Sequence, residues 1–171
     1  MHMSRGFVKE GDQEDIPVVP PRAHLPDGTL NYVTQNGFED LQQEQILLVN
    51  QRNDLIKESS EKNRIQINHI NAKLHLLNGR IKSAKVVDIT KQPKNEVHFG
   101  ATVKLFEELE GSSPTYQIVG VDEADISRNK VSFLSPISKA LLNKKVGDFI
   151  ELKTRNGVRE LEIIAVDYNN Q

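Results

Sequence analysis

The sequence contains no cysteine, and only 5% of its 171 residues are aromatic. The absence of cysteine excludes disulfides, thiolate chemistry and cysteine-based zinc sites, and it favours a reducing compartment, so we expect a cytoplasmic location. No apolar run approaches about 18 residues, and no signal-peptide pattern opens the chain. We therefore expect no membrane span and no membrane partner, and the scarcity of aromatics predicts a modest core.

An excess of charge of one sign is also missing, because 22 lysines and arginines face 24 acidic residues and the formal net charge is -2. These totals do not favour independent, sequence-specific nucleic-acid binding. His69 and His75 are six residues apart, so they do not share the helix face that an i, i+4 ligand pair uses. With no glycine-rich phosphate loop and no Ser-His-Asp pattern, we expect no metal site and no cofactor of its own.

The composition divides the chain into three segments, at residues 1–33, 34–85 and 86–171. Residues 1–33 are rich in acids, glycine and proline, and Pro17–Pro21 favours an extended conformation. We expect a disordered or extended N-terminal arm. The alternative is a docking peptide that lies along a partner or back on the globular part.

Residues 34–85 carry a heptad stripe that predicts two paired helices. Thr34 can cap the first helix. The stripe consists of Phe38, Leu41, Gln45, Leu48, Arg52 and Leu55, followed by Ile67, Ile70, Leu74, Leu77, Ile81 and Ala84. Only a short connection near 57–63 is available, so the pair must be an antiparallel coiled-coil hairpin, whose second helix is about 30 to 40 Å long.

Residues 86–171 change to short alternating runs that predict strands. The runs are Val97 with Phe99, then 102–105, 115–119, 130–133, 149–152 and 160–166. Asn156-Gly157 between two runs predicts a β-hairpin. Residues 136–142 predict one short helix, capped by Ser135 with proline at its first position. The predicted fold class is α+β, with the coiled-coil hairpin followed by a curved antiparallel sheet and one short helix.

Several motifs, in this order, resemble the C-terminal domain of the Gre transcript-cleavage factors, the GreA/GreB family. They are Phe99–Val103, Tyr116–Gly120, Leu134–Leu142, Lys145–Asp148 and Glu162–Tyr168. Residues 34–41, 70–74 and 85–88 resemble the entry to and exit from the family's hairpin. The resemblance covers roughly residues 31–168. It implies an FKBP-like fold for the C-terminal domain, without implying prolyl isomerase activity.

The resemblance also implies a partner, bacterial RNA polymerase, and a role in transcription elongation. It implies no enzymatic activity by the protein itself, because the family's cleavage reaction belongs to the active site of the polymerase. Family members grip the rim of the polymerase's secondary channel and point the coiled coil toward the active site. Carried over, the polymerase-binding residues are Asp122, Glu123, Asp125, Ser135, Pro136 and Ile137. Two simpler interpretations stay open, because Ser135-Pro136 is a good helix start on its own and the acidic turn could be solvated surface.

The turn of the hairpin departs from the family's pattern. Members that stimulate transcript cleavage carry Asp-x-x-Glu-Asn and then Tyr, whose carboxylates help hold a second magnesium ion. Here Glu58 and Glu61 keep the spacing, but Asn63 is displaced by one residue and no tyrosine follows. The hairpin also looks shorter than the family's, by roughly two turns per helix. Glu58 and Glu61 are therefore weak candidates, and Mg²⁺ shared with the polymerase is expected only if this tip is active.

Two other functions stay open. The hairpin and β domain could form an adaptor for a protein other than the polymerase. Homodimerisation through the helical stripe is weaker, because each hairpin already satisfies its own seam, and we expect a monomer.

Overall fold

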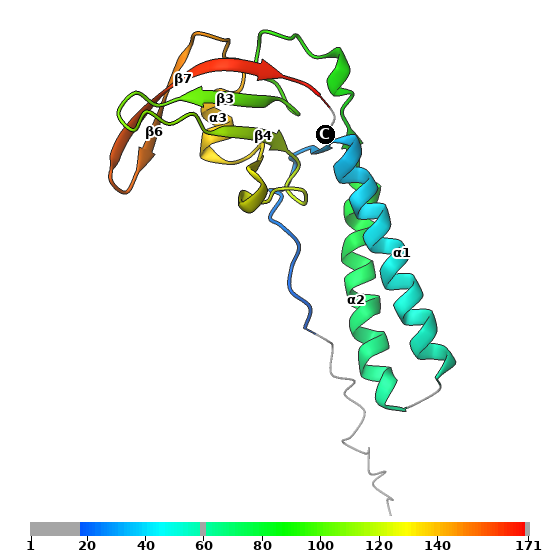
Figure 1. Ribbon diagram of the computed structural model, residues 1–171. Coiled ribbons are helices and arrows are strands. Elements are labelled where there is room, and N and C mark those ends of the chain that lie inside the picture. Colours follow the sequence, from blue (N-terminus) through cyan, green and yellow to red (C-terminus); the bar gives the residue numbers. More distant parts are fainter. Residues whose placement is uncertain (1–17, 59–60, 170–171) are drawn as a thin grey trace, which may run out of the picture.

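The computed structural model describes residues 18–58 and 61–169, and it contains a helical hairpin that projects from one end of a curled sheet (Figure 1). Two helices of 23 residues form the hairpin, α1 (Gln35–Lys57) and α2 (Glu61–Ser83). Each is about 34 Å long at the standard rise. None of the helices in these ranges combines the length and apolar character that crossing a bilayer requires.

A short parallel pair of strands closes the base of the hairpin. Strand β1 (Asn31–Val33) enters α1, and β2 (Ala84–Val86) leaves α2, with Asn31 opposite Ala84 and Val33 opposite Val86. Thr34 caps α1 as predicted, because its side chain accepts a hydrogen bond from the Gly37 amide. The chain therefore enters and leaves the hairpin at one place.

The C-terminal sheet has the strand order β5-β4-β3-β7-β6. Its strands are β3 (Thr102–Phe106), β4 (Thr115–Val119), β5 (Lys130–Ser132), β6 (Phe149–Thr154) and β7 (Gly157–Asp167). Helix α3 (Pro136–Leu141) packs against β6, and two 3-10 turns, η1 (Ile89–Lys91) and η2 (Ile126–Arg128), lie in the connections. One continuous apolar core on the α3 side holds this domain together, formed by Val97, Ala101, Val103, Leu105, Ile118, Val131, Leu141, Ile150, Leu161 and Ile163.

The predicted fold class is confirmed, with four differences in detail. The parallel pair of β1 and β2 was not predicted. The sheet is mixed rather than wholly antiparallel, because β4 and β5 run parallel. Val97 and Phe99 are buried, but they lie in an irregular segment instead of a strand. The predicted β6–β7 hairpin is present, but its two-residue turn is one position earlier, since Thr154 pairs with Gly157, whose φ of +122° suits glycine.

The predicted N-terminal arm lies outside the described residues as far as residue 17. Residues 18–30 have no regular secondary structure before the chain enters β1. This stretch lies back on the molecule, since Arg22 pairs with Glu44 of α1 and Ala23 O accepts a hydrogen bond from Arg80 of α2. Arg22 and Ala23 therefore contact the helical hairpin of the same chain.

Candidate functional site

The tip of the hairpin holds the two weak catalytic candidates at the ends of facing helices. Glu58 caps the end of α1, and Glu61 is the first residue of α2. Asn63 Nδ2 connects the two helices, since it lies 3.1 Å from Leu55 O and 3.3 Å from Glu58 Oε2. Asn63 therefore links the end of α1 to the start of α2, and it binds the carboxylate of Glu58.

The charges around the tip are mixed. Lys57 pairs with Asp54 at 3.1 Å, which places an ammonium group one residue before Glu58. Within residues 18–58 and 61–169, no group of three or more histidine, aspartate or glutamate side chains could hold a metal ion. A magnesium site concentrates oxygen ligands and negative charge. The described tip residues do not fit such a site by themselves.

The seam of the hairpin is apolar at its base and polar further out. Leu77 is fully buried and packs with Leu41 and Val33, against which Phe38, Leu48, Ile81 and Ala84 also pack. Further along, Gln45 donates to Asn78 at 2.6 Å, and Arg52 Nε is buried without a hydrogen-bond partner. The heptad stripe is thus confirmed as the helix contact, and its packing weakens toward the tip.

Asp122 lies at the joint between the hairpin and the sheet domain. Its side chain is 8% exposed, and its Oδ1 accepts a hydrogen bond of 2.8 Å from Arg22 Nε. Arg80 Nε lies 2.9 Å from the other oxygen, as an ion pair without hydrogen-bond alignment. Because Arg22 also pairs with Glu44 of α1, this carboxylate connects the arm, both helices and the sheet domain.

Arg22 carries the most connections in this cluster. Burial alone would lower the pKa of its guanidinium, but hydrogen bonds from it to Glu44 and Asp122 raise that pKa above its ordinary value. A guanidinium that bridges two carboxylates gains charge-assisted hydrogen bonds on both sides. The arm is therefore fixed to the joint at Arg22.

Glu123 connects the sheet domain to the start of α1. Its side chain is 5% exposed and pairs with Lys130 at 2.9 Å. Its other oxygen accepts a hydrogen bond of 2.5 Å from Thr34 Oγ1, the residue that caps α1. A carboxylate at a helix N-terminus is favourable because the helix dipole is positive there. Glu123 thus sets where the hairpin begins relative to the sheet.

Close packing supports these polar contacts. The rings of Tyr32, Phe99 and Phe133 form a mutual cluster with centroids 5.7 to 5.8 Å apart. A Cβ added at Gly120 would lie 2.6 Å from Tyr32 O, and one at Gly37 would lie 2.5 Å from Glu123 Oε2. At Gly120 the close atom is backbone, so only glycine allows this approach, while a side chain at Gly37 would displace the Glu123 carboxylate from the start of α1.

The remaining predicted polymerase-binding residues lie outside the joint. Asp125 is exposed and caps η2, and the hydrogen bond from the Ser127 side chain lowers its pKa. Ser135 caps α3, Pro136 is exposed at the first turn, and Ile137 is half-buried against the core. These four residues form a surface of mixed polar and apolar character at α3 and η2. The carboxylates of Asp122 and Glu123, by contrast, are already bound by side chains of the same protein.

Asp122 and Glu123 could be located from the sequence, but their partners could not. Arg22, Thr34, Arg80 and Lys130 supply those partners, and Thr34 lies 89 residues from Glu123 while Arg22 lies 100 from Asp122. The local signal was an acidic pair at the end of a strand. That signal does not tell whether the carboxylates face a partner molecule or the same chain.

Comparison with known proteins identifies the C-terminal part. Residues 92–168 match the family model described as transcription elongation factor GreA/GreB, C-terminal. This part of the chain is a GreA/GreB C-terminal domain. The predicted resemblance to the Gre family is therefore confirmed, and it rests on the domain to which the hairpin is fixed.

Curated relatives of the GreA/GreB domain are named transcription elongation factor GreA. The protein from Legionella pneumophila (strain Corby) is 45% identical over 93 residues, which cover 54% of this chain and 58% of that protein. The one from Maricaulis maris is 39% identical over 99 residues, covering 58% of this chain and 63% of that protein. The match thus spans about three fifths of the length of these relatives.

Solved structures to which this chain is similar include GreA factor homolog 1 (Gfh1) of Thermus thermophilus. It is 23% identical with a TM-score of 0.40, over 81% of this chain and 99% of that one. A GreA/GreB factor from Nitrosomonas europaea is 25% identical with a TM-score of 0.42, over 80% and 98% of the two chains.

Proposed function

We propose that this protein is a Gre-type elongation factor that binds bacterial RNA polymerase at the rim of the secondary channel. The GreA/GreB domain grips the enzyme, and the hairpin points into the channel and modulates elongation and backtracking. One observation carries the proposal: a GreA/GreB domain bears a projecting pair of helices whose base is locked by buried contacts (Figure 1). A cytoplasmic location and a monomeric state accompany this role.

The polymerase contact is assigned to the surface at α3 and η2. Pro136 and Asp125 are exposed there, and Ser135 and Ile137 border them. Asp122 and Glu123 belong to the same predicted surface, but their carboxylates are engaged in the joint. Their contribution to polymerase binding is therefore to orient the hairpin relative to the gripping surface.

The factor acts chiefly by occupying the channel. Stimulated RNA cleavage requires a tip that helps hold a second magnesium ion beside the polymerase's own. The described tip carries Glu58 paired with Asn63, a nearby ammonium group and no cluster of oxygen ligands. We therefore derive no cleavage step from Glu58 and Glu61.

The polymerase contact is tested by titrating purified RNA polymerase with the wild type and with Pro136→Asp. Aspartate is compatible with the first turn of α3, so the fold should persist, while a charge buried at the interface should weaken binding at least about tenfold. Pro93→Asp is the matched control, because Pro93 is also exposed but belongs to the segment between η1 and β3 instead of α3. Unchanged affinity of a folded Pro136→Asp variant would contradict the assigned surface.

The action of the hairpin is tested on backtracked elongation complexes with magnesium. We expect the wild type to change pausing without stimulating RNA cleavage. A Glu58→Ala/Glu61→Ala variant should have the same effect on pausing and should also not stimulate cleavage. The matched pair Glu39→Ala/Asp40→Ala removes two exposed acids at the base of α1. Cleavage stimulated by the wild type and lost only in the tip variant would instead make the protein a cleavage factor. The adaptor alternative is not favoured by the comparisons.

A further inference from the structure

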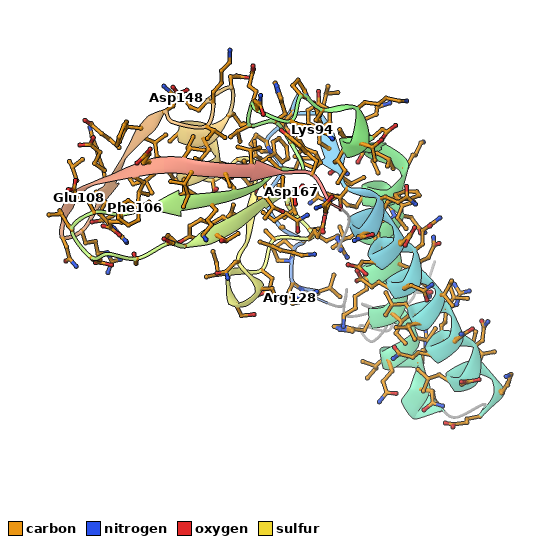
Figure 2. The ribbon with its side chains drawn as sticks, turned by 45° about the horizontal axis from the view of Figure 1, so that its top comes forward. Lys94, Phe106, Glu108, Arg128, Asp148 and Asp167 are labelled. Atoms are coloured by element: carbon orange, nitrogen blue, oxygen red, sulfur yellow. The ribbon has the colours of Figure 1, made fainter. Side chains whose placement is uncertain are left out.

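The outer face of the sheet domain, opposite α3, carries the half-buried Phe106 and the exposed Phe149 among glutamates. Phe106 of β3 and Phe149 of β6 both pair with Glu162 of β7, so the three lie side by side on one face. Their neighbours Leu105, Ile150 and Ile163 point to the other face and are buried in the core with Leu141 of α3. Figure 2 shows Phe106 and Glu108 at the end of the domain away from the hairpin.

This face contains a hollow of about 500 Å³. It is lined by Phe106, Glu108, Leu109, Phe149, Glu160 and Glu162. Leu109 is 90% exposed and Phe149 is 57% exposed, so two large apolar side chains beside the hollow meet water. Apolar side chains grouped around a hollow are typical of interaction surfaces, whereas isolated ones are ordinary.

The charged side chains that line the hollow are all glutamates, namely Glu108, Glu160 and Glu162. Glu151 stands directly opposite Glu160 across β6 and β7, an arrangement that costs stability because like charges repel at that spacing. Among the described residues, none of Glu108, Glu151, Glu160 and Glu162 forms an ion pair, and the neighbouring Arg159 is engaged by Glu107 and Glu110. The carboxylates that line the hollow thus have no ion-pair partner among the described residues, and the lysines on this face, Lys104 and Lys153, stand two residues from Phe106 and Glu151 along their strands.

We propose that this hollow docks a basic segment of a protein partner, with an arginine seated over Phe149 and its guanidinium among the glutamates. An arginine side chain matches both parts of the surface, because its stem and planar head stack on an aromatic ring while its N–H groups reach carboxylates. A nucleic acid does not match, since its phosphates would meet the same carboxylates.

The surface is separate from the polymerase contact assigned above. Helix α3 packs on the core side of the sheet, whereas the hollow lies on the opposite side. It also lies away from the hairpin, so a factor whose hairpin is inserted in a channel would keep this face outside (Figure 2). The inference does not depend on the proposed function, because it uses only the geometry of the sheet domain.

The test is a titration of the full chain, ¹⁵N-labelled, with a capped peptide of alternating arginine and glycine, followed by NMR. We expect shift changes centred on residues 106–109, 149–151 and 160–162. Glu160→Gln/Glu162→Gln should weaken binding at least about tenfold, and Phe149→Ala about fivefold. The same peptide with lysine for arginine should bind more weakly, because an ammonium group does not stack as a guanidinium does.

The matched control is Glu39→Gln/Asp40→Asn, which neutralises two exposed acids of α1 and should leave affinity within twofold. The glutamine variants of the hollow relieve repulsion, so thermal unfolding should show them at least as stable as the wild type. Shift changes spread over all acidic surfaces, with equal losses in both variant pairs, would overturn the proposal. A concentration-dependent mass increase without peptide, with shifts at the hollow, would overturn it in favour of a second copy of the chain.

Discussion

The two ends of the hairpin are built on different principles. At the base, Leu41, Leu74 and Leu77 are buried, and two carboxylates of the sheet domain join the helices to it. At the tip, Ile56 and Ile65 are 53% and 75% exposed, and no described residue from 42 to 69 is buried. One end is therefore stabilised by packing, while the other is held mainly by hydrogen bonds near the turn.

This difference follows from geometry, since a two-helix rod can bury only one stripe. The base gains extra burial from β1, β2 and the aromatic cluster, whereas the tip has nothing to pack against. Local opening should therefore begin at the tip and stop at Leu74 and Leu77. The tip of the hairpin can therefore change its conformation while the base keeps the direction in which the hairpin projects.

The largest expected effect is at the centre of the base. Leu77→Ala should lower the free energy of unfolding by about 3 to 4 kcal/mol, because it removes a fully buried side chain and leaves a cavity. Urea denaturation followed by circular dichroism measures it. The matched control is Leu47→Ala on α1, where the leucine is 60% exposed, and a loss there as large as at Leu77 would contradict the comparison.

The next effect is at the joint. Asp122→Ala should cost about 3 kcal/mol, because it leaves Arg80 and Arg22 without their shared carboxylate. The direction of the hairpin should also become less defined. Since the native chain has no cysteine, two engineered cysteines carrying spin labels, one on each unit, report this as a broader distance distribution. A distribution as narrow as that of the wild type would show that Asp122 does not orient the hairpin.

A smaller effect is expected within the sheet domain, at the ion pair of Glu107 and Arg159, which takes no part in the joint. The hydrogen bond from Arg159 lowers the pKa of Glu107 from its ordinary value of 4.5. A carboxylate with a lowered pKa in the folded state stabilises the protein fully above its unfolded pKa, and this contribution is lost as the pH falls through the folded pKa. Thermal unfolding from pH 6 to 3 should show a steeper loss for the wild type than for Glu107→Gln. Parallel curves would rule out this linkage.

The smallest effect is expected at the tip. Glu58→Ala/Glu61→Ala should change the free energy of unfolding by less than about 0.5 kcal/mol, because both side chains are exposed. Hydrogen exchange should be fast at residues 53–58 and 63–66 and slow at 74–78. A stability loss near that of Leu77→Ala would mean that the tip is as firmly packed as the base.

Periodic features could be predicted from the sequence because they are local. The heptad stripe gave the helix contact, with Leu41, Leu74 and Leu77 at its centre, and Thr34 gave the start of α1. The positions of β3 to β7 followed from alternation, whereas Val97 and Phe99 lie outside any strand and the short strands β1 and β2 were missed. Strand direction did not follow from alternation, since a run of alternating residues is compatible with either, and the parallel pair of β4 and β5 was missed.

The candidate site was predicted less completely, for a different physical reason. Ser135 and Asp125 could be placed because each caps the turn that follows it. The roles of Asp122 and Glu123 depend on partners about 90 to 100 residues away along the chain. Charge pairing over such separations is decided by the fold, and the sequence alone offers many cations to each acid.

The parallel pair of β1 and β2 has a consequence for how such proteins can diverge. Asn31 and Ala84 face each other, so the hairpin between them is an insertion whose first and last residues are paired. Adding seven residues to each helix near the tip would lengthen the hairpin by about 10 Å, and the contacts at its base would keep their register. The length of the hairpin can therefore change without any change in the sheet domain that holds it.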